Sequence, residues 1–209
     1  MSIRKFMPFL TLLALPLVVG SSCAFFFSSG GGSNDRDDKD KDDDEIIVIA
    51  NSGSFGEPLV QGVSYESGSL AGITDSNGAF EYETGKTVRF FIGEVALGEP
   101  VTGKSVITAQ DLVADGEPDA TAAINISRLL LSLDAEPGDD VITIPKAVQA
   151  AAVRSNEDLS SAIEFLDFSN ESAFVNAASQ LVAVLTHDYP HTATLVDADN
   201  AQERMIDRP

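Results

Sequence analysis

The sequence is short of cysteine, tryptophan and basic residues, and each shortage argues against a class of protein. Cys23 is the only cysteine among 209 residues, so the chain cannot form an internal disulfide. Lys and Arg number 13 against 33 Asp and Glu, which gives a formal net charge of −20. Nucleic acids and anionic lipid headgroups are bound by clustered Lys and Arg, so this balance argues against both partners. The lack of tryptophan argues against a sugar-stacking surface.

Patterns typical of catalysis or cofactor binding are also scarce. The chain has no G-x-S-x-G nucleophile elbow and no H-E-x-x-H zinc motif. The stretch GEPVTGKS, Gly98 to Ser105, matches the phosphate-binding pattern G-x-x-x-x-G-K-[ST]. That pattern binds nucleotides only where a helix begins at its lysine, and the β-branched residues 106–108 favour a strand instead. We therefore expect no nucleotide and no other cofactor.

The first 22 residues have the three parts of a secretory signal peptide. Arg4 and Lys5 give a positive start, residues 6–19 are mostly apolar, and small residues follow at positions 20–22. The apolar run is shorter than the roughly 20 residues that a helix needs to cross a bilayer. We expect residues 1–22 to be a signal peptide that is removed on export.

Cys23 stands at the end of this segment, as in bacterial lipoprotein signals, which the stretch resembles. In those signals the cysteine is lipidated and becomes the new N-terminus. The resemblance implies attachment to a membrane through a lipid on Cys23, and Ala24 after it implies sorting to the cell outer membrane. Gly20 occupies a position where that pattern usually has an aliphatic residue. The alternative is ordinary cleavage that releases a soluble periplasmic or secreted protein.

Residues 23–45 have the composition of a tether. Residues 28–33 are glycine and serine, with no charged or apolar side chain among them. Asp35 to Glu45 holds eight acids, three bases and no apolar residue, and so cannot join a core. We expect residues 23–45, lipidated Cys included, to be a disordered, solvated acidic linker.

Residues 46–108 are interrupted by turn signals every 8 to 12 residues, which is typical of a β-domain. Asp75-Ser76-Asn77-Gly78 is a tight-turn signature, in which Asp75 caps the turn. The expected strands are Ile46–Ala50, Leu59–Tyr65, Leu70–Thr74, Ala79–Tyr82, Val88–Ile92 and Val95–Leu97.

The stretch PLVQGVSYESGSLAGITDSNGAFEYETGKTVRFFIG resembles the transthyretin-like or carboxypeptidase-regulatory-like β-sandwich. The matching positions are Pro58, Leu59, Gly62, Val63, Gly72, Thr74, Asp75, Gly78, Phe80 and Tyr82. Pro58 to Asp134 also resembles a group of Gram-negative surface lipoproteins that join such a domain to a helical segment like INISRLLLSLD. These resemblances imply a small antiparallel β-sandwich and no active site.

Residues 109–209 have helical periodicity. Ile126, Leu129, Leu130 and Leu133 fall on one helix face. Further helices are expected to open at Thr143 and Pro145, to cover 157–165, to contain Phe174 to Leu185, and to follow a capping Asp197. The predicted fold class is α+β: a signal peptide and acidic linker, then a β-sandwich-like domain at 46–108 and a helical domain at 109–209.

Acidic and histidine side chains offer weak candidates for metal binding. Asp134, Glu136, Asp139 and Asp140 lie close together in LDAEPGDDV, which is similar to a calcium loop with its glycine and closing glutamate misplaced. A loop rich in turn residues explains the same letters. His187 and His191 have a metal-binding spacing on a helix, but Pro190 interrupts that helix.

These patterns favour a lipid-anchored cell-envelope protein that is not an enzyme. It would present a binding or structural module on the acidic tether, with an envelope protein or glycan as partner. Two alternatives remain: a periplasmic enzyme of hydrolase type, and a soluble, calcium-responsive adhesive protein.

Overall fold

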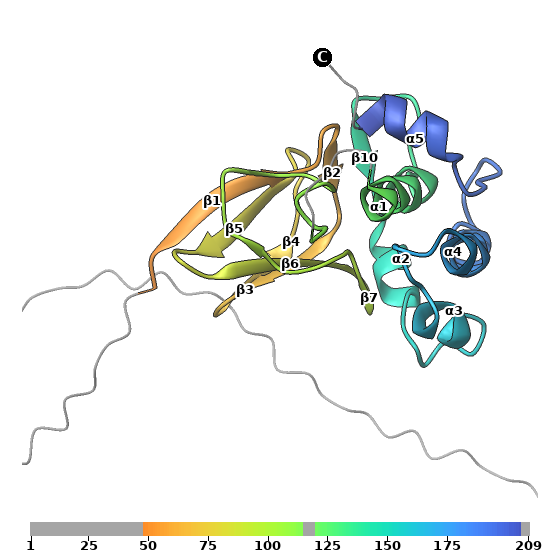
Figure 1. The fold of residues 1–209 in the computed structure, drawn as a ribbon, viewed down its shortest axis with the longest axis horizontal. Coiled ribbons are helices and arrows are strands. Elements are labelled where there is room, and N and C mark those ends of the chain that lie inside the picture. Colours follow the sequence, from red (N-terminus) through yellow and green to blue (C-terminus); the bar gives the residue numbers. More distant parts are fainter. Residues whose placement is uncertain (1–47, 115–119, 206–209) are drawn as a thin grey trace, which may run out of the picture. The chain divides into compact units, whose positions relative to one another are not determined.

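The computed structural model of the chain describes residues 48–114 and 120–205 (Figure 1). These residues belong to one compact unit, Glu45–Pro209. The expected signal peptide and the whole of the expected linker, Cys23 included, lie outside the described ranges, as do residues 46 and 47. Within those ranges, several strands are followed by helices, which confirms the α+β class. No helix among the described residues is long and apolar enough to cross a membrane.

One sheet is built around the first strand. It contains β1 (Ala50–Phe55), β5 (Ala79–Glu83) and β9 (Val106–Ile107) in the order β5-β1-β9. β1 pairs with β5 in antiparallel and with β9 in parallel orientation. The parallel partner was not expected, because β9 is only two residues long and its apolar letters do not identify a pairing direction.

The second large sheet is antiparallel throughout. It contains β3 (Ser64–Ser67), β4 (Leu70–Ile73), β6 (Thr87–Ile92) and β7 (Val95–Ala96) in the order β4-β3-β6-β7. The short strand β8 (Val101–Thr102) pairs with the start of β6. Gly78, with φ of +63°, closes the turn before β5 in the conformation expected for a glycine of a tight turn.

Aromatic rings join these two sheets. Phe55 of β1 stacks on Phe90 of β6 with ring centroids 4.1 Å apart. Phe80 of β5 meets Phe90 at 5.2 Å and Tyr65 of β3 at 5.9 Å, both edge to face. Each contact links a strand of one sheet to a strand of the other, so these four residues form an aromatic core between the sheets. Edge-to-face and stacked rings of this kind contribute about 0.5–1.5 kcal/mol each beyond the area they bury.

Two strand predictions are wrong in their bounds. The first strand begins at Ala50 rather than Ile46, because the mostly polar residues 50–54 pair with β5. The expected strand Leu59–Tyr65 is split into β2 (Leu59–Gln61) and β3 by Gly62, whose φ is +87°. A residue in that left-handed region interrupts the extended backbone of a strand.

The helices follow the strands. They are α1 (Thr121–Ser132), α2 (Lys146–Ala151), α3 (Ser160–Glu164), α4 (Glu171–Leu185) and α5 (Ala198–Met205). The apolar face predicted for the first helix is confirmed, since Ile126, Leu129, Leu130 and Leu133 are all buried. The cap predicted for the last helix is also confirmed, because Asp197 Oδ1 accepts a hydrogen bond from the Asn200 amide at 2.9 Å.

A strand inside the helical region connects it to the sheets. β10 (Val141–Thr143) runs parallel to β2, with Ile142 opposite Val60. The prediction that Thr143 opens a helix is therefore wrong, because that residue completes the pairing with β2 and the helix begins after Pro145. Buried side chains of strands and helices belong to one continuous hydrophobic cluster.

Candidate functional site

A hollow lies where the strands meet the helices. It is a cleft of about 650 Å³, bordered by β7, the start of α1 and the connection between α3 and α4. Val95, Leu112, Ile126 and Ile163 line it, each no more than 6% exposed, so its deep part is apolar. A volume of this size is in the range of protein binding sites.

A second, shallower hollow adjoins the first. It has about 450 Å³ and lies over β3, β4 and β6, where Ser64, Ala71 and Phe91 line it. Glu94 and Arg154 border both hollows, and their side chains form an ion pair with 3.2 Å between Arg154 Nη1 and Glu94 Oε2. The Arg154 amide also donates a hydrogen bond to Glu94 Oε2 at 3.0 Å, which fixes the boundary between the hollows.

The rim of the cleft is acidic. Glu94, Glu99, Glu164 and Asp167 are exposed, and Arg154 is the only basic residue among the described lining residues. Side chains of the described part leave no buried nitrogen or oxygen without a hydrogen-bond partner. The hollows therefore offer carboxylates at their edge and apolar surface at their floor.

Backbone contacts hold the walls of the cleft. The Glu99 amide donates to the Leu112 carbonyl at 2.8 Å, which ties the segment after β7 to the segment before α1. Asn125 of α1 donates through Nδ2 to the Phe168 carbonyl at 2.9 Å and so positions the connection between α3 and α4. Neither contact has a sequence signal, because both join residues that lie more than ten positions apart through common polar groups.

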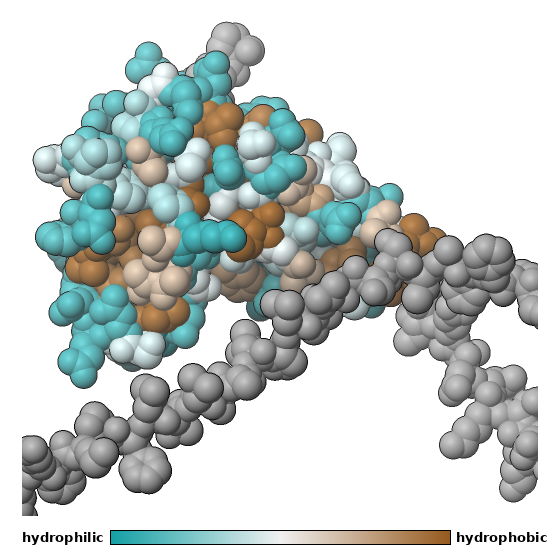
Figure 2. All heavy atoms as spheres, turned by 180° about the vertical axis from the view of Figure 1, so that it is seen from behind, coloured by the Kyte–Doolittle hydropathy of each residue, from teal (hydrophilic) through white to brown (hydrophobic). Residues whose placement is uncertain are grey.

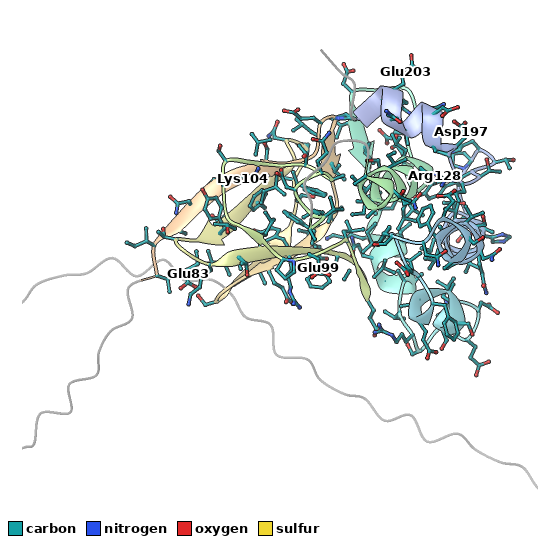
Figure 3. All side chains as sticks on the ribbon, in the orientation of Figure 1. Glu83, Glu99, Lys104, Arg128, Asp197 and Glu203 are labelled. Carbon is teal, nitrogen blue, oxygen red and sulfur yellow. The ribbon has the colours of Figure 1, made fainter. Side chains whose placement is uncertain are left out.

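Arg128 is a buried residue that the sequence reasoning missed. Its Nε donates to the Val196 carbonyl at 2.8 Å, and its Nη1 donates to Asn125 Oδ1 at 2.9 Å and Glu171 Oε1 at 2.8 Å. Its guanidinium carbon also lies 5.1 Å from the centre of the Phe174 ring. Figure 3 shows Arg128 on the helical side of the unit and Lys104 among the strands. The sequence did hold one indication that Arg128 is buried, because this charged residue lies within the apolar run ISRLLLSL.

The four calcium candidates act as loop residues. Asp134 is buried, and its Oδ1 accepts hydrogen bonds from the amides of Glu136 at 3.1 Å and Thr143 at 3.0 Å. Asp139 Oδ1 accepts from the Val141 amide at 3.0 Å, and Asp140 is exposed. Over the described ranges, the structure brings together no group of three or more His, Cys, Asp or Glu residues suited to a metal ion.

Tyr189 packs beside this loop. Its hydroxyl donates a hydrogen bond to the Leu133 carbonyl at 2.7 Å. Burial, with a smaller contribution from the negative charge of Asp134, raises the pKa of Tyr189 to about 12. The ring of Tyr189 also lies 5.4 Å from that of His191, while His187 is exposed near the end of α4.

The phosphate-loop letters do not form a phosphate loop. Strand β9, not a helix, follows Lys104 and Ser105, and Lys104 Nζ is bonded to Asp111 Oδ1 at 2.6 Å. Burial alone would raise the pKa of Asp111, but hydrogen bonds from Lys104 and Thr108, together with the positive charge of Lys104, hold it below its ordinary value. Lys104 is thus part of a structural ion pair in this segment.

Asp75 has the turn-capping role predicted for it. Its Oδ1 accepts hydrogen bonds from the amides of Asn77 at 2.8 Å and Ala79 at 2.9 Å. The bonds from Ala79 and Asn77 lower the pKa of the carboxyl group, because they stabilise its charged form. These two hydrogen bonds explain the position of the Asp75 carboxylate as that of a turn cap.

Comparisons of the chain with protein-family models, with curated proteins and with solved structures found no match.

Proposed function

We propose that this protein is a lipid-anchored cell-envelope protein, a non-enzymatic binding or structural module held at the outer membrane by an acidic tether. The single thiol of the sequence, Cys23, carries the proposal, because it lies between a signal-like segment and a Gly, Ser and Asp tract. One lipid chain binds a membrane only reversibly, whereas several chains on one cysteine hold it firmly. The membrane is thus the first partner proposed, and an envelope protein or glycan is the second.

Structural roles for the prominent charged residues support a role without catalysis. Asp75, Asp134 and Asp197 accept backbone hydrogen bonds, Asp111 pairs with Lys104, and Arg128 joins helices. General acid or base catalysis needs a titratable group within reach of a substrate. The carboxylates that do border the cleft are exposed at its rim.

We also propose that the two large sheets form the transthyretin-like sandwich implied by the sequence resemblance, as in the surface lipoproteins that Pro58 to Asp134 resembles. The aromatic core supports this reading, since Phe55 and Phe80 of one sheet pack on Phe90 of the other. A module of this kind would present loops and sheet faces for binding while its interior stays filled.

Mass spectrometry of the exported protein tests the anchor. We expect a mature N-terminus at Cys23 carrying fatty acyl groups, and partitioning into the detergent phase. The Cys23→Ser variant should lose the acyl mass and become soluble in water, because no other thiol can accept the lipid. Ser29→Ala, in the same tract but away from the cleavage point, serves as the matched control and should partition like the parent. A water-soluble parent without acyl groups would contradict the proposal.

A further inference from the structure

We propose that the two adjoining hollows form one groove that binds an extended polypeptide segment carrying both apolar and basic side chains. The inference rests on the proposed function as a binding module and adds the place and the partner chemistry. The groove is the surface formed by the cleft and the shallow hollow, which lie on either side of the Glu94–Arg154 pair.

The shape of the groove favours an extended segment. One hollow lies between β7 and the helices, and the other lies over the outer face of β3, β4 and β6. A compact molecule would occupy one of the two, whereas a chain in strand conformation advances about 3.3 Å per residue and can place alternate side chains in both. The ion pair of Glu94 and Arg154, where the two hollows meet, would lie beneath the middle of such a chain.

Apolar surface in the groove favours apolar side chains in the partner. Half-buried Val113, Leu166 and Phe168 line the cleft, and half-buried Phe91 lines the shallow hollow. Phe165, which stands between two lining residues, is 66% exposed. An exposed large hydrophobic residue beside an apolar cleft is typical of a protein-binding surface. Figure 2 shows that hydrophobic residues on one face of the unit form several separate patches among hydrophilic ones.

The charges of the groove favour a partner of positive charge. Five carboxylates border it, at Glu66, Glu94, Glu99, Glu164 and Asp167. The one described cation, Arg154, is already paired with Glu94, so the remaining four carboxylates leave a negative rim. Lys and Arg side chains of a partner would complement this rim, and an acidic segment or an anionic lipid surface would be repelled by it.

The same rim argues against a metal ion or a small polar molecule. Its carboxylates are not gathered into a group suited to a metal within the described ranges. In the described part, every buried side-chain nitrogen and oxygen already has a hydrogen-bond partner. Small-molecule sites usually place a few polar groups deep in the pocket, where they fix the orientation of the ligand.

Fluorescence anisotropy on the full chain in discs of neutral lipid tests the inference, with empty discs as the blank. The probes are labelled peptides of about twelve residues, long enough to cross both hollows. One combines Leu and Val with Lys, a second replaces every Lys by Glu, and a third replaces every Leu and Val by Ser. We expect the first to bind at least about tenfold more tightly than either of the others. Higher salt should weaken its binding by screening the rim.

Charge reversal localises the binding. The double variant Glu99→Lys and Glu164→Lys should bind the basic apolar peptide about tenfold more weakly or worse than the parent does. The matched control is Glu81→Lys with Glu203→Lys, an equal change of charge at exposed residues on β5 and α5, outside both hollows. It should change the affinity by less than about twofold. Phe165→Ser, which leaves the charges intact, should also weaken binding.

Three outcomes would overturn the inference: no binding of any peptide, equal binding of the acidic peptide, or equal effects of the two charge-reversed pairs. The anchor is tested separately. The Cys23→Ser variant should bind the basic apolar peptide as the parent does, because the substitution changes none of the described residues that line the groove. Loss of lipid attachment and loss of peptide binding are therefore independent results.

Discussion

Arg128 joins three segments of the chain through one guanidinium group. It bonds Asn125 within α1, Glu171 at the start of α4, and the Val196 carbonyl before α5. The Arg128 side chain is 7% exposed and that of Glu171 is 56% exposed, so water reaches one end of the pair. The stabilisation from Arg128 consequently lies more in its hydrogen bonds to buried Asn125 and half-buried Val196 than in its charge pair.

At the residue scale we predict that replacing Arg128 destabilises the protein much more than replacing its partner Glu171. Arg128→Met keeps much of the side-chain volume but leaves Asn125 Oδ1 and the Val196 carbonyl without this donor. It should lower the free energy of unfolding by about 3 kcal/mol. Glu171→Gln should cost no more than about 1 kcal/mol, because its amide oxygen still accepts a hydrogen bond and the site is exposed. Urea unfolding measures both, and equal losses would contradict the prediction.

At the scale of elements, the turn between β6 and β7 is fastened to α2. The Gln149 side chain accepts hydrogen bonds through Oε1 from the Gly93 amide at 2.6 Å and from Ser64 Oγ at 3.1 Å. The Glu94 amide donates to the Ala152 carbonyl at 2.7 Å. This contact positions the Glu94–Arg154 pair, and with it the boundary of the two hollows.

Gly93 allows the turn between β6 and β7 to approach α2 closely. Replacing it should distinguish the cost of backbone strain from the cost of a steric clash. Its φ is +58°, and a Cβ there would lie 2.3 Å from the Ala152 carbonyl oxygen. Gly85 has a similar φ of +76°, but an added Cβ would meet nothing within 4 Å. Gly85→Ala should therefore cost only the backbone strain of about 1–2 kcal/mol, and Gly93→Ala should cost clearly more. Thermal unfolding compares the stability of the two variants. Equal losses of stability would show that α2 moves away from the added methyl group at no cost.

On the scale of the whole molecule, strands and helices share one core. β10 pairs with β2, and buried side chains such as Val60, Ile126 and Val148 belong to the same hydrophobic cluster. Neither part can unfold without exposing apolar surface of the other, and such exposure is the main cost of unfolding.

This shared core predicts a single unfolding transition. The three tyrosines are Tyr65 and Tyr82 on strands and Tyr189 near the end of α4, and the chain has no tryptophan. In a Tyr189→Phe background, tyrosine emission reports on the strands, while far-ultraviolet circular dichroism is dominated by the helices. The two signals should change together in urea. Two separated midpoints would show that the strand-rich and helix-rich parts fold independently.

Local patterns were enough for much of the fold. The turn at Asp75 to Gly78, the apolar face of α1 and the cap at Asp197 depend on residues within a few positions of one another, and the structure has all three. The strand at Ala50–Phe55 was missed because its letters are polar, and only pairing with β5 makes it a strand. β10 is apolar and short, and it was missed because its partner β2 lies some 80 residues away in the chain.

By itself, the sequence determined the acidic character of the chain, a strand-rich part followed by a helix-rich part, and the apolar face of α1, because charge and periodicity are local properties. Only the tertiary structure decided that Glu94 and Arg154 lie between two hollows and that Arg128 is buried among helices. Both arrangements join segments far apart in the chain. Their contacts depend on pairing register and helix packing, which no short stretch of residues specifies.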